Sequence, residues 1–241
     1  PKEVIGLVAG LIGNNKDNNS LCDPVSGSGT LLVEVGKRVG IRGANLFGQE
    51  ANWNQYALTK MNRMLNGFKD STFFWGDSLS NPKLTDDGGL KRFDIVASIP
   101  PFADKWATEE AEFDRYGRFQ YGIPPRSQAT WAYISHILAS LKPNGRAVVV
   151  VPAGVLFRTS ESKIRHQIIE HNLLETVIEL PQNLFYGAAI STAILVFRKD
   201  RKMTQTLFMD ARKGYISNKG IYKLSDAMVE QLLNTYKGFL S

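Results

Sequence analysis

Short apolar runs typical of β-strands alternate with helical stretches along most of this chain, and this alternation constrains the fold more than any other feature. Parallel strands produce such a pattern because each needs a crossover, usually a helix, to return the chain across the sheet. The unbroken apolar run at residues 147–151 fits a central strand that is covered on both faces. We therefore expect an α/β chain with a mixed, mostly parallel sheet and helices on both faces.

The hydrophobic periodicity predicts the individual elements. Predicted helices cover residues 4–12, 31–39, 56–65, 130–141, 161–171 and 225–236. Predicted strands cover residues 20–23, 45–50, 71–75, 93–98, 147–151, 176–180 and 192–197, with an edge strand over 206–209. In the third helix, Leu58, Met61 and Leu65 share one face, and Pro143-Asn144-Gly145 is expected to close the fourth helix.

Composition excludes several other classes of protein. Of the 241 residues, 43% are hydrophobic and 22% are charged, which is unlike a disordered chain, a collagen or a coiled coil. No apolar run reaches the roughly 18 residues of a membrane-spanning helix. The single cysteine, Cys22, excludes an internal disulfide and a cysteine-rich zinc site. We expect one domain over residues 1–241, cut from a longer cytoplasmic protein, because the chain has no initiator methionine and no signal peptide.

The charge balance allows an anionic partner. Twenty-nine basic against 23 acidic residues give a net charge of +6, which suits nucleic acid but also occurs in many enzymes that never bind it. The polar loop at residues 103–127 interleaves aromatic and basic side chains, namely Trp106, Phe113, Tyr116, Phe119 and Tyr121 with Lys105, Arg115, Arg118 and Arg126. Composition alone allows two interpretations of this segment, a DNA-facing loop and an ordinary surface loop.

A glycine turn joins the first predicted strand to the second helix. Its sequence is Asp23-Pro24-Val25-Ser26-Gly27-Ser28-Gly29, and the candidate cofactor-binding residues are Asp23, Val25, Ser26, Gly27, Ser28 and Gly29. The turn lacks the third glycine of a dinucleotide-binding loop, since Leu32 stands there, and the acid at its start would repel a phosphate. A cationic ligand with hydroxyl groups, such as S-adenosylmethionine, fits better; a plain tight turn is the alternative.

Acidic residues also follow the next two strands. Glu50 could accept both hydroxyls of a ribose, and Asp77 could accept a hydrogen bond from the adenine amine of the same cofactor. Ser78, beside Asp77, is a further candidate cofactor contact. Each acid alone could be a solvated helix cap, but three at successive strand ends favour a binding site.

The fourth strand ends in Ser98-Ile99-Pro100-Pro101-Phe102, and here a family resemblance becomes specific. With the glycine turn, this stretch resembles amino-group DNA methyltransferases, whose motif reads Asn-Pro-Pro-Phe or Asn-Pro-Pro-Tyr. More narrowly, the chain resembles the modification subunit of type I restriction–modification systems. Supporting stretches are 48–50, 61–65, 76–79, 118–125, 154–158 and 180–186, together with Trp106. The resemblance runs over nearly all the chain, and the family's N-terminal helical region and C-terminal tail lie outside it.

The resemblance implies a Rossmann-like S-adenosylmethionine-dependent fold and methyl transfer to the N6 amine of adenine in DNA. It also implies a specificity subunit and a restriction subunit as partners; the lack of a long apolar run already argues against a membrane. The catalytic positions would be Ile99, Pro100, Pro101 and Phe102. In the family, the motif Asn and the carbonyl of the first proline accept hydrogen bonds from the amine, and the aromatic ring stacks on the flipped base. Phe185-Tyr186-Gly187 would shape the base pocket, although such aromatics are also common in protein cores.

Ile99 departs from the motif, since it stands where the family has Asn and offers no acceptor. By analogy with a deleted oxyanion-hole donor, the loss amounts to about 2.7–4 kcal/mol, or about 10²–10³ in rate. Strand alternation should point the oxygen of Ser98 away from the face of Ile99. We therefore predict a chain that binds S-adenosylmethionine but methylates DNA poorly. The alternatives are a non-catalytic scaffold that binds cofactor or DNA and, less well matched, a dinucleotide-dependent oxidoreductase.

The remaining reactive side chains indicate no other chemistry. His136, His166 and His171 match no metal-binding spacing, so no metal site is predicted and none of them is expected to be catalytic. Cys22 is expected to be a small buried hydrophobic residue.

Overall fold

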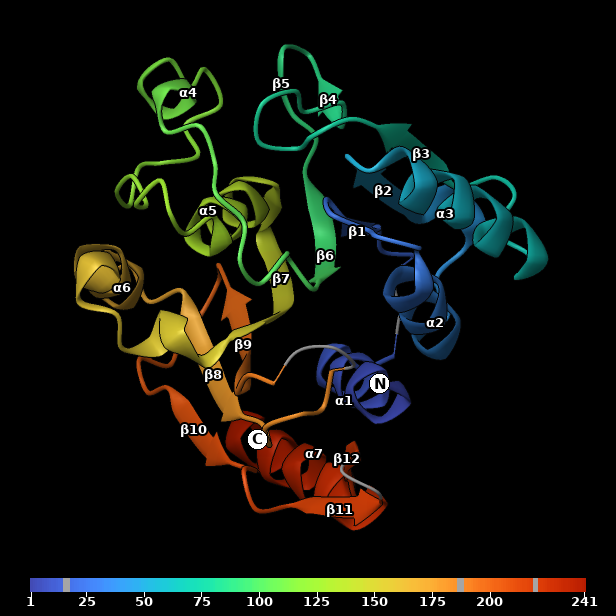
Figure 1. Ribbon diagram of the computed structural model, residues 1–241, viewed down its shortest axis with the longest axis vertical. Helices are drawn as coiled ribbons and strands as arrows, with labels where there is room; N and C mark the ends of the chain where they lie inside the picture. The colour runs from blue at the N-terminus through green and yellow to red at the C-terminus, as the bar shows by residue number, and fades with distance from the viewer. Residues whose placement is uncertain (15–17, 186–188, 219–220) are drawn as a thin grey trace.

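The central feature of the computed structural model is an eight-stranded sheet (Figure 1). The structure describes residues 1–14, 18–185, 189–218 and 221–241. The strands of the sheet are β1 (Leu21–Asp23), β2 (Leu46–Glu50), β3 (Thr72–Trp75), β6 (Phe93–Ser98), β7 (Leu141–Pro152), β8 (Leu174–Glu179), β9 (Thr192–Arg198) and β10 (Leu207–Asp210). Their spatial order is β10-β8-β9-β7-β6-β1-β2-β3, which puts β10 at one edge as expected.

The sheet is mixed and mostly parallel. Among its described strands, β9 alone runs against its neighbours, pairing antiparallel with both β7 and β8. Strands β1, β2 and β3 extend the sheet one way, and the chain then returns so that β6 pairs with the other side of β1. The strand order thus reverses between β1 and β6. In open α/β sheets a ligand binds beside this point, outside the carboxyl ends of the strands.

Helices cover both faces of the sheet, as predicted. They are α1 (Lys2–Ile12), α2 (Thr30–Val39), α3 (Trp53–Leu65), α5 (Thr130–Ala139), α6 (Ser162–Glu170) and α7 (Asp226–Leu240), while the short helix α4 (Glu109–Glu112) lies in the loop after β6. Side chains of β7 alternate between two cores, because successive strand residues point to opposite faces. Val148 and Val150 join the core formed with α1, α2 and α7, whereas Val149 and Val151 join the core formed with α5 and α6.

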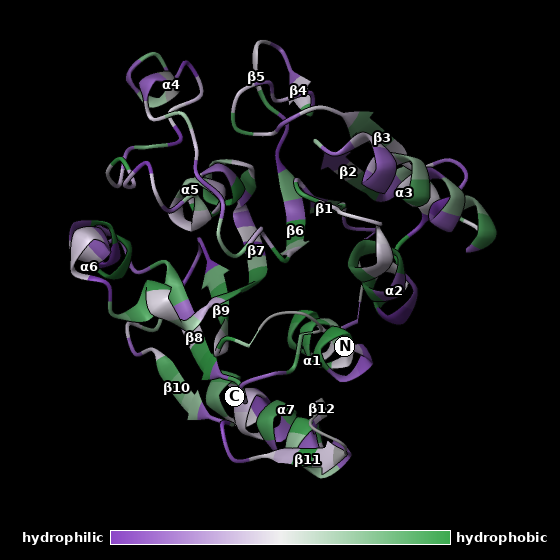
Figure 2. Ribbon diagram, viewed as in Figure 1, coloured by the Kyte–Doolittle hydropathy of each residue, from purple (hydrophilic) through white to green (hydrophobic). Residues whose placement is uncertain are grey.

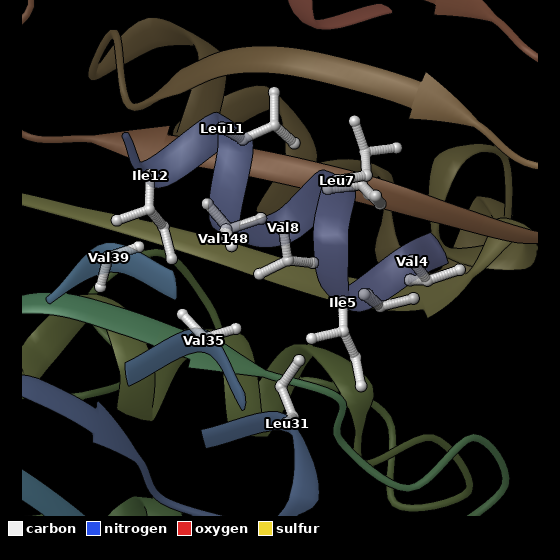
Figure 3. Packing of buried hydrophobic residues seen from close by; sticks show 14 of the residues in the cluster. Val4, Ile5, Leu7, Val8, Leu11, Ile12, Leu31, Val35, Val39 and Val148 are labelled. Atoms are coloured by element: carbon white, nitrogen blue, oxygen red, sulfur yellow. The ribbon is translucent and has the colours of Figure 1, made fainter. Parts of the chain in front are cut away.

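The first helix is nearly all apolar, and Figure 2 colours most of it as hydrophobic. It needs apolar partners on several sides, because it lies between the sheet, α2 and α7. Figure 3 shows its side chains facing those of α2 across a shared layer, with Ile5, Val8 and Ile12 opposite Leu31, Val35 and Val39. This layer fixes α2, and with it the glycine turn that precedes α2.

The expected end of the fourth helix is wrong. Helix α5 ends at Ala139, and β7 already begins at Leu141, so Pro143, Asn144 and Gly145 lie within the strand. Leu141 pairs with Phe93 of β6, and a bulge follows before the regular register resumes. Phe93 is distant from Leu141 in sequence, so the local Pro-Asn-Gly signal gave no indication that the strand begins before it.

Two small hairpins were not predicted. They pair β4 (Thr85–Asp86) with β5 (Gly89–Leu90) and β11 (Tyr215–Asn218) with β12 (Ile221–Leu224). The structure also has short 3₁₀ helices at Gly43–Asn45, Ala153–Leu156 and Thr159–Glu161. Within the described residues, no helix is both long and apolar enough to cross a bilayer.

The apolar face predicted for α3 exists but points to solvent. Leu58, Met61 and Leu65 are 48%, 60% and 84% exposed. The buried residue of this helix is Thr59, which faces the glycine turn. The helix therefore contributes polar side chains to the glycine turn instead of apolar side chains to the core.

Candidate cofactor and active site

A cavity of about 410 Å³ lies beyond the carboxyl ends of β1, β2, β3 and β6, where the strand order reverses. Seven of the predicted site residues line it: Val25, Gly27, Glu50, Asp77, Ser78, Ile99 and Pro101. Asn52, Asp104 and Tyr133 also line it and were not predicted. A larger hollow of about 580 Å³ lies between residues 79–82 and 109–118, but it lacks the strand-end carboxylates. We therefore place the site in the smaller cavity.

The glycine turn is held open by its backbone conformation and by α3. Gly27 and Gly29 have φ values of +54° and +75°, a region that favours glycine. The hydroxyl of Thr59 donates to the Gly27 carbonyl at 2.6 Å, and Nδ2 of Asn62 donates to the Ser28 carbonyl at 3.2 Å. Sequence reasoning missed both contacts, since polar residues within a helix give no signal of a distant loop.

Asp23 lies beneath this turn and is not part of the cavity lining. Its Oδ1 accepts hydrogen bonds from the Val25 amide at 3.0 Å and from the Ser98 hydroxyl at 2.7 Å. Burial, with a smaller contribution from the charge of Glu50, raises the pKa of Asp23 to about 7 despite these two hydrogen bonds. Asp23 thus positions the turn from below, and a direct contact with a ligand stays a prediction.

The carboxylates of the cavity are fixed by backbone amides. Glu50 accepts from the amides of Gly27 at 2.8 Å and Asn52 at 2.7 Å, and Asp77 accepts from the Leu79 amide at 2.7 Å. Both carboxylates are thereby held at the cavity and keep lone pairs for a ligand.

Asp104 and Tyr133 add to the acidic field. Burial and the nearby Asp77 raise the pKa of Asp104. Burial, followed by the charges of Asp77, Asp104 and Glu50, raises the pKa of the Tyr133 phenol, which keeps it neutral. Asp104 lies two residues after the Pro-Pro-Phe stretch, so its position in the sequence could have marked it.

Three further predicted contacts lie outside the cavity lining. Ser26 is buried, and its hydroxyl has no hydrogen-bond partner among the described residues. Ser28 is on the exposed side of the turn, with its hydroxyl 2.9 Å from that of Thr30. Gly29 is the N-cap residue of α2, and a Cβ added to it would lie 3.0 Å from Cγ2 of Thr59.

The Pro-Pro-Phe stretch borders the same cavity. Ile99 is half-buried against the core and, with Pro101, lines the cavity, whereas Pro100 is buried. The ring of Phe102 meets the ring of Phe185 edge-on, with centroids 5.4 Å apart. Tyr186 and Gly187, named with Phe185 as shaping a base pocket, lie outside the described residues.

The expectation of a DNA-facing loop needs correction for three of its residues. Trp106, Arg118 and Tyr121 are buried, because the segment folds back onto α5 and the residues after β3. Phe113 is 86% exposed, and Lys105, Arg115 and Arg126 are also at the surface. Aromatic and basic residues thus divide between the interior and the surface in a way that composition does not reveal.

Among the described residues, the other reactive groups form no second centre. His136 is buried, and this burial together with the nearby Arg118 lowers its pKa to about 3. Cys22 is buried in the apolar core as predicted, and burial raises the pKa of its thiol. The described part of the chain contains no cluster of His, Cys, Asp and Glu that could hold a metal ion.

The residues of the cavity fit S-adenosylmethionine. The lining contains three carboxylates and no basic side chain, which suits a ligand with cationic groups and hydroxyls and disfavours a pyrophosphate. The volume lies within the range of about 300–1,000 Å³ that is common for small-ligand sites. The unpartnered Ser26 hydroxyl is a further polar group that a ligand or a water molecule could satisfy.

Sheet order, glycine turn and strand-end carboxylates together define the Rossmann-like fold of methyltransferases. The chain belongs to the N-6 DNA methylase family, whose model matches residues 1–240.

Curated relatives of the chain support this family assignment. The chain is 33% identical to the type I restriction enzyme MjaVIII methylase subunit of Methanocaldococcus jannaschii, over 99% of this chain and 44% of that protein. It is 30% identical to the MpnII methylase subunit of Mycoplasma pneumoniae, over 98% of this chain and 46% of that protein. The chain thus spans about half the length of these curated relatives.

A solved structure has the same architecture. The methyltransferase subunit of a type I restriction-modification system from Streptococcus thermophilus superimposes with a TM-score of 0.91 at 32% identity, covering 99% of this chain and 52% of that one. The EcoKI M protein shares the fold, with a TM-score of 0.76 at 22% identity over 97% of this chain and 52% of that one.

Proposed function

We propose that this chain is the catalytic part of the modification subunit of a type I restriction–modification system, and that it transfers a methyl group from S-adenosylmethionine to adenine N6 in DNA. The single observation that carries the proposal is the acidic cavity beyond the carboxyl ends of β1, β2, β3 and β6, bordered by Ile99 and Pro101. Membership of the N-6 DNA methylase family supports the reaction and the substrate. A cytoplasmic location is part of this proposal.

The residues of the cavity would divide the cofactor between them. S-adenosylmethionine, when bound, supplies an electrophilic methyl group on a sulfonium. Glu50 would accept hydrogen bonds from the ribose hydroxyls, and Asp77 would accept a hydrogen bond from the adenine amine. The glycine turn would lie along the remainder of the cofactor, where Gly27 lines the cavity without a side chain. Phe102 would stack on a flipped target adenine, held by its edge-on contact with Phe185.

Ile99 would limit the rate of this reaction. It lines the cavity at the motif position but has no polar atom, so only the Pro100 carbonyl would be left to accept from the target amine. The resulting loss of orientation and transition-state hydrogen bonding is the basis of a second candidate function, a scaffold that binds cofactor or DNA and holds a complex together. Proposed partners in either case are DNA, a specificity subunit and a restriction subunit.

Transfer of labelled methyl groups separates the two candidates. The protein, with the specificity subunit of its own system, is incubated with labelled S-adenosylmethionine and adenine-containing DNA. Slow transfer to N6 that Ile99→Asn accelerates supports the methyltransferase. No transfer by either form, in a protein that still binds the cofactor, supports the scaffold.

A further inference from the structure

One guanidinium outside the cavity is buried to an unusual degree. The side chain of Arg118 is only 4% exposed, as is that of its partner Asp114. Nε of Arg118 lies 2.7 Å from Oδ1 of Asp114, and the Arg118 amide donates to Oδ2 at 2.6 Å. Removing a charge from water carries a large penalty, so a buried arginine needs several well-placed partners.

The remaining partners of Arg118 are backbone carbonyls of the loop after β3. Nη1 donates to the carbonyl of Leu79 at 2.8 Å and to that of Ser78 at 3.2 Å. The rings of Tyr116 and Phe119 lie 5.4 and 5.2 Å from the guanidinium carbon. The planar fork of arginine reaches the carboxylate and the carbonyls at once, which the single ammonium of lysine cannot do.

The same loop holds a carboxylate of the cofactor cavity. Asp77 and Ser78 line the cavity, and the Asp77 carboxylate accepts from the Leu79 amide. The Ser78 hydroxyl donates to the Pro24 carbonyl, which ties the loop to the glycine turn. Arg118 therefore binds the outer side of residues 77–79, and the inner side of this span faces the cavity.

His136 completes the surroundings without adding charge. Its Nδ1 lies 3.5 Å from Nη1 of Arg118, and its pKa of about 3 keeps the imidazole neutral at physiological pH. The charged group facing Arg118 is thus Asp114, and the pair is electrically balanced.

We propose that Arg118 is a positioning residue for cofactor binding. It fixes the Ser78 and Leu79 carbonyls so that the Asp77 carboxylate is presented to the adenine amine of the cofactor. The inference rests on the proposed function for the identity of the ligand. It also gives the segment around residues 113–121 a role, because this segment supplies Arg118 and thereby supports the cofactor cavity.

A double-mutant cycle with Asp77 tests this role. Arg118→Met combined with Asp114→Asn removes both buried charges and leaves neither unpaired. Calorimetry then measures the affinity for S-adenosylmethionine and for 5′-methylthioadenosine, which keeps the adenosine and methylthio groups but lacks the amino-acid part. We expect both affinities to fall at least tenfold. In an Asp77→Asn background the same change should have an effect of less than threefold, since Arg118 acts through Asp77.

Two further variants complete the experiment. Arg126→Met with Glu109→Gln removes an exposed ion pair of the same segment and should leave both affinities unchanged. Arg118→Lys keeps the charge and should give an intermediate loss; it replaces the double variant if the latter does not fold.

Three outcomes would overturn the inference. Affinities within twofold of the unaltered protein would do so while leaving the proposed function intact. Equal losses of affinity in the Asp77 and Asp77→Asn backgrounds would also overturn the inference and leave the proposed function intact, because they indicate a general structural effect. Absence of binding by the unaltered protein would overturn the proposed function, and the inference with it.

Discussion

The hydroxyl of Ser98 donates a 2.7 Å hydrogen bond to Oδ1 of Asp23, joining the last residues of two neighbouring parallel strands. The Ser98 oxygen is therefore engaged beneath the glycine turn. Ile99, the next residue, lines the cavity and brings only carbon atoms to it. The two observations agree with the strand alternation expected from the sequence, and they leave the motif position without a side-chain acceptor.

Replacing Ile99 by Asn should restore that acceptor. We expect the rate of methyl transfer to DNA to rise by about 10²–10³, while the affinity for S-adenosylmethionine changes little. The measurement is the single-turnover rate of labelled methyl transfer. Ile99→Leu is the matched control, because Leu has nearly the shape of Asn and no acceptor. A similar rate for the Leu and Asn variants would show that shape, not hydrogen bonding, limits the reaction.

Asp23 should make the stability of the protein depend on pH. Its folded-state pKa of about 7 is above its ordinary value, so the folded protein keeps a proton that the unfolded chain has lost. The stability from this group is complete below pH 4 and falls as the pH rises to about 7, by at most about 1.4 kcal/mol per unit. Urea unfolding from pH 4.5 to 8 measures it. Asp23→Asn should lack this component; parallel curves for the two proteins would contradict the prediction.

Gly29 should tolerate a side chain less well than Gly27. Both residues have positive φ values, but only at Gly29 would a Cβ meet Thr59, at 3.0 Å. The backbone strain amounts to about 1–2 kcal/mol in each alanine variant. Crowding against Thr59 should add about 1 kcal/mol or more to Gly29→Ala. Denaturant unfolding of both variants checks the difference, and equal losses would mean that Thr59 moves aside freely.

Two buried serines should respond in opposite ways to alanine. The Ser26 hydroxyl has no partner in the part of the chain that the structure describes, so Ser26→Ala should leave the free energy of unfolding unchanged or raise it by up to about 1 kcal/mol, and should weaken cofactor binding. Ser98→Ala removes a hydrogen bond to buried Asp23 and should destabilise the fold by about 1–3 kcal/mol. Thermal unfolding and calorimetry provide both readouts. A large loss of stability in Ser26→Ala would indicate that its hydroxyl has a structural partner.

Local patterns predicted most of the sheet, because buried strands and helices differ in hydrophobic period. Strand β6 covers the predicted residues 93–98, and α2 and β9 lie within one residue of their predicted bounds. The start of β7 was missed because Leu141 is held by Phe93, a partner that no local window contains. The apolar face of α3 was read correctly, but its direction depends on Thr59 facing the glycine turn.

Site residues at or just after the ends of strands were predictable from the sequence, and site residues elsewhere were less so. Glu50 and Asp77 line the cavity because strand ends meet at one edge of a parallel sheet. Asp23 is also the last residue of a strand, but hydrogen bonds hold its carboxylate under the loop. From the sequence, Arg118 is one of the basic residues of the loop at 103–127, for which a DNA-facing loop and an ordinary surface loop were both open. Its burial depends on carbonyls at Ser78 and Leu79, far away in sequence.

Calorimetric titration with S-adenosylmethionine and with NAD, on the unaltered protein and on Glu50→Gln, tests the central claim most directly. An acidic cavity for a cationic methyl donor predicts saturable heat with S-adenosylmethionine, none with NAD, and an affinity about tenfold or more lower in Glu50→Gln. No heat with S-adenosylmethionine, or equal binding of NAD, would contradict the account.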